Sequence, residues 1–117
     1  MKKHARLVTD LCKPGIDIKQ SLTVEKIEML HMALGIAGET GELVDAVKKH
    51  VMYEKEIDRE NVIEELGDLE FYMEGLRQIL AIDRKETLEA NYDKLKVRYK
   101  TGYSNKAAQL RADKNGS

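Results

Sequence analysis

The sequence of 117 residues contains no tryptophan, one proline, one cysteine and one phenylalanine. A single cysteine, Cys12, excludes a disulfide within the chain and indicates a reducing compartment. We expect Cys12 to pack as a small apolar residue. With only one proline, almost the whole chain is free to form helix. Good helix formers dominate what remains, so the expected fold class is all-α.

The sequence also lacks an excess of charge of one sign and a long apolar run. It has 20 basic and 21 acidic residues, for a net charge of -1. This balance gives no reason to expect a nucleic-acid polymer or a membrane as partner. No apolar segment follows the basic start, and no run approaches the length of a membrane span. We therefore expect a soluble, cytoplasmic protein.

Length and polarity divide the chain into one domain, residues 1–103, and a polar tail, residues 104–117. A short helix is expected over residues 4–12. The Lys-Pro-Gly sequence that follows predicts a stop. Ile16 and Ile18 then alternate with polar residues and are expected in a loop.

Three longer helices are predicted from apolar residues at helical spacing. The first runs from Thr23 to about Val51, with the stripe Ile27, Leu30, Leu34, Ala37, Gly41, Val44 and Val51. The second runs from Asp58 to about Leu80, with the stripe Val62, Leu66, Leu69, Met73, Leu76 and Leu80. The third runs from Asp83 to about Lys100, with the stripe Leu88, Tyr92, Leu95 and Tyr99. Thr23, Asp58 and Asp83 are residue types that cap helix N-termini.

Two carboxylate pairs, Glu39 with Glu42 and Glu65 with Asp68, carry the most specific chemistry. Each pair is spaced i, i+3, so its side chains lie on one face of a helix. If the two helices run antiparallel, the four carboxylates can converge. Such a group needs cations or protons to neutralise it. Hard oxygen ligands favour Mg²⁺ or Mn²⁺, and these ions usually bind phosphate.

The surroundings of the carboxylates support this interpretation. Glu65 falls within the apolar arc of its helix, where a carboxylate needs a partner such as a metal ion. The first long helix has glycines at 35, 38 and 41, which either leave room for a ligand or allow close helix packing. On the last helix, Asn91, Lys94 and Arg98 lie along one edge. This edge either binds phosphate oxygens or is a solvated flank.

In this order the motifs resemble those of the MazG-like all-α nucleoside triphosphate pyrophosphohydrolase superfamily. That superfamily includes phosphoribosyl-ATP pyrophosphohydrolases and dimeric dUTPases. The stretch Gly38-Glu39-Thr40-Gly41-Glu42 is similar to its E-E-x-x-E motif, with glycine in place of the first glutamate. The stretch Glu65-Leu66-Gly67-Asp68 matches E-x-x-D, and residues 91–99 are similar to its substrate-binding N-x-x-K-L-x-x-R-Y segment. The resemblance covers roughly residues 22–103.

The resemblance implies hydrolysis of a (deoxy)nucleoside triphosphate to the monophosphate and pyrophosphate. Glu39, Glu42, Glu65 and Asp68 would form the catalytic site and hold Mg²⁺, or Mn²⁺, with Glu39 activating the attacking water. The expected substrate ligands are His31, Asn91, Lys94, Arg98 and Tyr99. The resemblance also implies a homodimer or homotetramer in which helices of two protomers share one bundle.

Three alternatives remain open at this point. The enzyme could have a narrow specificity, for dUTP, dCTP or a phosphoribosyl-ATP type of substrate. The chain could instead be a catalytically silent helical interaction module, although the phase of Glu65 opposes this. A di-iron carboxylate bundle needs two E-x-x-H motifs, and only Glu28 with His31 supplies one.

Overall fold

The computed structural model describes residues 2–99, which form five helices and no strand, so the expected all-α fold is confirmed. The helices are α1 (Lys2–Leu11), α2 (Gly15–Ser21), α3 (Val24–Met52), α4 (Arg59–Ile79) and α5 (Arg84–Arg98). Among them, no helix combines the length and the apolar character that crossing a bilayer would require.

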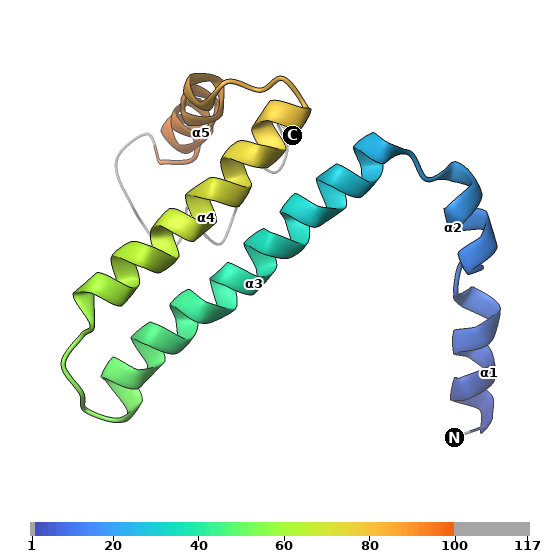
Figure 1. Ribbon diagram of the computed structural model, residues 1–117, viewed down its shortest axis with the longest axis horizontal. Coiled ribbons are helices and arrows are strands. Elements are labelled where there is room, and N and C mark those ends of the chain that lie inside the picture. Colours follow the sequence, from blue (N-terminus) through green and yellow to red (C-terminus); the bar gives the residue numbers. More distant parts are fainter. Residues whose placement is uncertain (1, 100–117) are drawn as a thin grey trace.

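The helices α3 and α4 form an antiparallel pair joined by residues 53–58 (Figure 1). In the described range they are the two helices that pack extensively on each other. Their predicted starts are confirmed by capping. The Thr23 hydroxyl accepts from the Lys26 amide at 3.1 Å, and the Asp58 carboxylate accepts from the Asn61 amide at 3.0 Å. Local capping therefore sets where both helices begin.

Three local predictions are wrong. Ile16 and Ile18 lie in α2 rather than in a loop, because the Pro14 carbonyl accepts from the amides of Asp17 and Ile18 and starts a new turn. Cys12 is exposed rather than packed, because α1 meets no other helix extensively. Asp83 precedes α5 but makes no side-chain capping bond. The predicted end of α5 at Lys100 and the tail 104–117 lie outside the described residues.

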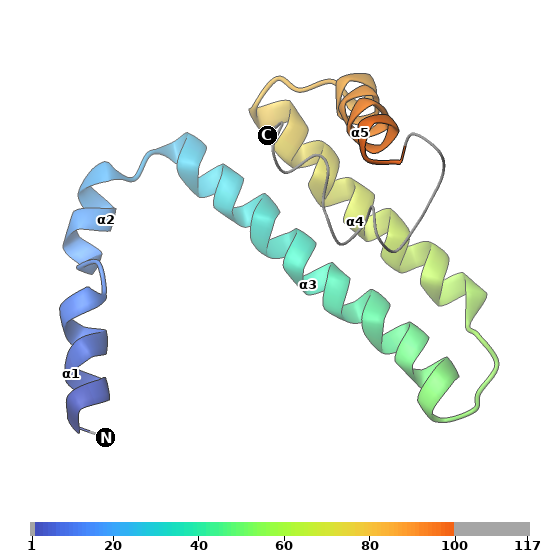
Figure 2. The ribbon, with the colours of Figure 1, turned by 180° about the vertical axis from the view of Figure 1, so that it is seen from behind.

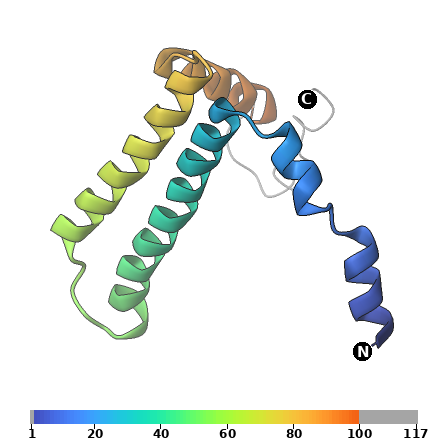
Figure 3. The same ribbon diagram turned by 45° about the vertical axis from the view of Figure 1, so that its right-hand side comes forward.

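The helices α1 and α2 form an N-terminal arm, residues 2–21, that leaves the start of α3. The arm lies on the side of α3 away from α4 in all three views (Figures 1, 2 and 3). It does not pack extensively on α3 or α4. Its apolar residues Leu7, Val8 and Leu11 are exposed. The arm therefore gains no stability from a core within the described part of this chain.

Close contact between glycine and a large side chain brings α3 and α4 together. A Cβ atom at Gly35 would overlap the Tyr72 ring, and one at Gly75 would overlap the Met32 sulfur. Gly35 is thus a packing glycine, whereas Gly38 and Gly41 have open space beside them. The less exposed side chains of α3 are Met29, Met32, Ile36, Glu39, Leu43 and Ala46. Ala46 is buried, and the other five are half-buried.

The predicted apolar stripe of α3 lies on the surface of the single chain. Leu34 is 62% exposed and Val44 is 59% exposed, and Ile27, Leu30 and Val51 are also exposed. At about 100° per residue, the stripe lies opposite Met32, Ile36 and Leu43, which are less exposed. It is therefore a second apolar face of α3, opposite the face that packs on α4.

Candidate metal centre

Three of the four predicted carboxylates meet across the middle of the α3–α4 pair. Glu39 of α3 and Glu65 and Asp68 of α4 each offer a carboxylate oxygen, and these oxygens all lie within 4.8 Å of one another. The i, i+3 spacing puts Glu65 and Asp68 on one face of α4, and the antiparallel pairing puts Glu39 opposite them. Glu42 lies outside this group, although its charge still acts on Glu65.

Glu65 is the most constrained member of the cluster. Its Oε2 atom is buried without a hydrogen-bond partner. Its carboxyl pKa is raised from 4.5 to about 7, first by a hydrogen bond with Glu39, then by burial and by the charges of Glu39, Glu42 and Asp68. A buried, unpartnered oxygen beside other carboxylates needs a proton or a cation. The donor set consists only of carboxylates, which fits a hard divalent cation.

An aromatic group adjoins the cluster along the α3–α4 seam. Tyr72 contacts His31 edge-on, with ring centroids 6.2 Å apart and planes at 63°. It also contacts Phe71, with centroids 5.1 Å apart and planes at 89°. Tyr72 lies one helical turn beyond Asp68. The predicted substrate ligand His31 is exposed and lies two helical turns from Glu39 along the α3–α4 interface.

Sequence reasoning missed Tyr72 as a member of this site. A usable signal was present, because Gly35 is four residues before Glu39 and Tyr72 is four residues after Asp68. In an antiparallel pair these two positions meet one turn from the carboxylates, where a glycine can accommodate a ring.

The structure does not bring the predicted phosphate ligands of α5 against the carboxylates. Helix α5 lies across the C-terminal end of α4 and packs extensively on neither α3 nor α4 (Figure 1). Asn91 and Tyr99 line a hollow on α5, and the Arg98 guanidinium lies over the Tyr99 ring at 5.8 Å. The roles predicted for Asn91, Lys94, Arg98 and Tyr99 therefore remain predictions.

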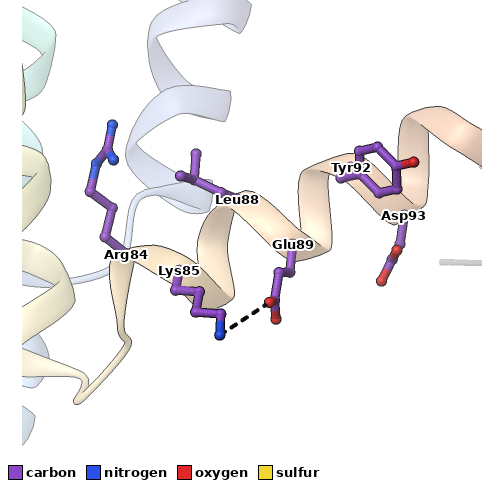
Figure 4. Close-up of a pocket in the computed structure, with 6 residues that line it drawn as sticks. All are labelled: Arg84, Lys85, Leu88, Glu89, Tyr92 and Asp93. Carbon is purple, nitrogen blue, oxygen red and sulfur yellow. Dashed lines mark ion pairs between the residues drawn. The ribbon is translucent and has the colours of Figure 1, made fainter.

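A second hollow on α5 is lined by no residue of the carboxylate cluster (Figure 4). Its lining residues are Arg84, Lys85, Leu88, Glu89, Tyr92 and Asp93. Lys85 and Glu89 form an exposed ion pair there, with 3.8 Å between Nζ and Oε1. Exposed pairs of this kind contribute little binding or stability. We assign no site to this hollow.

Fold and site together define a class: an all-α protein with a carboxylate cluster, suited to a divalent cation, across an antiparallel helix pair. The family model of the MazG nucleotide pyrophosphohydrolase domain matches residues 27–103. The chain belongs to this family, as the motifs predict. The match includes α4, α5 and nearly all of α3, and it excludes the N-terminal arm. No curated protein and no solved structure matches the chain.

The raised pKa of Glu65 predicts how the stability of the metal-free protein depends on pH. The folded state holds the Glu65 proton more tightly than the unfolded state, whose pKa is 4.5. The protonated Glu65 carboxyl therefore adds to the free energy of unfolding below pH 4.5, and this contribution is lost as the pH rises to about 7 and beyond. In EDTA, the melting temperature of the wild type should fall relative to that of Glu65→Gln between pH 5 and pH 8. A difference that stays constant over this range would contradict the prediction.

Proposed function

We propose that the protein is a Mg²⁺-dependent nucleoside triphosphate pyrophosphohydrolase that converts (d)NTP to (d)NMP and pyrophosphate. The observation that carries this proposal is the Glu65 carboxylate, whose Oε2 atom is buried and unpartnered and which offers an oxygen within 4.8 Å of oxygens of Glu39 and Asp68. Membership of the MazG family supports the class of reaction. An interaction module would have no use for such a costly arrangement.

In this proposal Glu39, Glu65 and Asp68 bind the cation, and Glu42 adds negative charge beside them. A bound Mg²⁺ would neutralise phosphate charge as the bond between the α- and β-phosphates breaks. Glu39 orients the attacking water and accepts its proton. His31 and Tyr72 contact the nucleoside one to two turns along the seam, where an aromatic face can stack on a base.

We further propose that the protein acts as a homodimer paired through α3. Six of the seven residues of the exposed α3 stripe are placed symmetrically about residue 39. Ile27 and Val51 are equidistant from that position, as are Leu34 and Val44, and Ala37 and Gly41. An antiparallel pair about a two-fold axis would therefore match apolar or small residues at these positions, whereas Leu30 would lie opposite Lys48. The small central residues allow close approach of the two helices.

Pairing of two chains also offers a way to complete the site. Within one chain, α5 does not lie against the carboxylates. We assign the phosphate contacts of Asn91, Lys94, Arg98 and Tyr99 to the α5 of a second copy. Each site would then use carboxylates from one protomer and cations from the other.

The direct test is pyrophosphate release from a panel of canonical and modified NTPs and dNTPs. With Mg²⁺ we expect equal amounts of pyrophosphate and nucleoside monophosphate, and none in EDTA. The ranking of substrates within the panel would show whether the enzyme is a general pyrophosphohydrolase or one confined to dUTP, dCTP or a related nucleotide. Release of inorganic phosphate instead of pyrophosphate would refute the proposed reaction.

A further inference from the structure

The N-terminal arm presents an apolar edge with no partner in the described chain. On α1, Leu7, Val8 and Leu11 lie on one side of the helix, and Thr9 lies on the opposite side. All three apolar residues are exposed, and Leu11 is 74% exposed. Ile16 and Ile18 extend exposed apolar surface into α2. An amphipathic helix of this kind is stabilised mainly by burying its apolar edge.

The joint between α2 and α3 holds the arm away from its own helix pair. The Lys26 ammonium donates to the Ser21 carbonyl at 2.9 Å. The Lys26 amide donates to the Thr23 hydroxyl at 3.1 Å. These bonds link the end of the arm to the first turn of α3. They stabilise the observed direction of the arm, in which it packs extensively on neither α3 nor α4.

An apolar hollow on α3 is the matching surface. It is lined by Leu43, Val44, Val47, Lys48, Val51 and Met52. Val44 and Val51 also belong to the α3 stripe, so the hollow adjoins the proposed α3–α3 contact. At 100° per residue, Leu43 and Val47 lie beyond the stripe, on the other side of it from His31 and Glu42. A segment that covers the hollow would therefore leave the nucleotide side of the helix open.

The proposed pairing of two α3 helices brings an arm to this hollow. In an antiparallel pair centred on residue 39, the start of one α3 lies beside the end of the other. The arm leaves the start of α3 on the side away from α4 (Figure 3). The exposed stripe also lies on the side of α3 opposite α4. With the centre at residue 39, position 24 lies beside position 54 of the second copy, so the arm emerges at the end of the second α3 that carries residues 43–52.

The charges of the two parts are complementary. The arm, residues 2–21, contains five basic and two acidic residues. Residues 24–99 contain eleven basic and eighteen acidic residues. A basic arm is attracted to the acidic body of a second copy, which favours this partner over another basic surface.

We propose that the arm is an exchanged clasp, in which the apolar edge of α1 and α2 covers the α3 hollow of a second copy of this chain. The inference rests on the proposed dimer and not on the proposed reaction. Because the arm lies outside the residues matched by the MazG family model, it is a feature of this chain that the family match does not account for. Each dimer would contain two such clasps, related by the two-fold axis.

The single native cysteine allows a direct test with the full-length protein. Cys12 is exposed at the end of α1 and can carry a nitroxide spin label. Spin-labelled chains are mixed with ¹⁵N-labelled Cys12→Ser chains, so that only contacts between chains are detected. We expect the amide signals of Val44, Val47 and Val51 to lose intensity relative to a sample with reduced nitroxide.

Two variants with the same added charge sharpen the test. Leu11→Glu in the spin-labelled chain should remove the broadening and weaken dimerisation at least about tenfold in sedimentation equilibrium. Thr9→Glu, on the opposite side of α1, should change neither. A dimer without this broadening would overturn the clasp and leave the dimer standing. Broadening only when label and ¹⁵N share one chain would also overturn it, because the arm then folds back.

A monomer at all concentrations would overturn both the clasp and the proposed dimer. Pyrophosphate release measured on the same samples separates these outcomes from a failure of the proposed reaction.

Discussion

Replacing Glu65 by glutamine is expected to lower the rate of pyrophosphate release by about 10²–10⁴-fold. The substitution removes the negative charge of the carboxylate whose Oε2 atom is buried and unpartnered. The shape of the side chain is retained, and the repulsion by Glu39 is relieved. We therefore expect a folded protein with weaker Mg²⁺ binding, measured by calorimetry, and a lower kcat at saturating Mg²⁺.

The matched control is Glu64→Gln, one residue earlier on α4. Glu64 is exposed and is not a member of the carboxylate cluster. The Glu64→Gln substitution changes the net charge by the same amount as Glu65→Gln and should leave both Mg²⁺ binding and kcat within about twofold of the wild type. Equal losses in the two variants would mean that net charge, and not the cluster, determines activity.

Replacing Leu34 by glutamate is expected to weaken dimerisation by about 10³-fold or more, because two carboxylates per dimer would be buried without partners. In the single chain Leu34 is 62% exposed, so the variant loses no contact with its own α4. In the proposed pairing it opposes Val44 of the second copy. The dissociation constant can be measured by sedimentation equilibrium, with helicity followed by circular dichroism.

Ala90→Glu is the matched control for Leu34→Glu. Ala90 is exposed on α5, on the side opposite Leu88, Tyr92 and Leu95. The Ala90→Glu substitution adds the same charge to a helix surface and should leave the dissociation constant of the dimer unchanged. If Leu34→Glu behaves like Ala90→Glu, the α3 stripe is not the dimer interface.

Local signals in the sequence were sufficient for most of the fold. Caps at Thr23 and Asp58 and apolar periodicity located α3 and α4 to within one or two residues. The seven residues of α2 were missed because so short a helix completes only two turns, which is too few for its periodicity to be distinguished from alternation. The pattern also could not tell which face of α3 meets α4, since the exposed stripe is as apolar as a core.

The carboxylate cluster was predicted from spacing alone, because i, i+3 pairs on antiparallel helices have few ways to meet. The exact register was not predictable. It brings Glu39, but not Glu42, into the group with Glu65 and Asp68, and it depends on the fit of Tyr72 against Gly35. Contacts of this kind depend on tertiary packing, which a single sequence does not reveal.

The two glycine contacts of the α3–α4 pair have a consequence for the choice of ion. Gly35 lies one turn from Glu39, and Gly75 lies two turns from Asp68. Both glycines let the backbones approach more closely than a residue with a Cβ atom would, and so set how narrow the carboxylate cluster can be. Ca²⁺ needs metal–oxygen distances of about 2.3–2.6 Å and Mg²⁺ about 2.0–2.1 Å. The size of the ion that fits is thus governed from positions 35 and 75, which bear no ligand atoms and would be the places to redesign it.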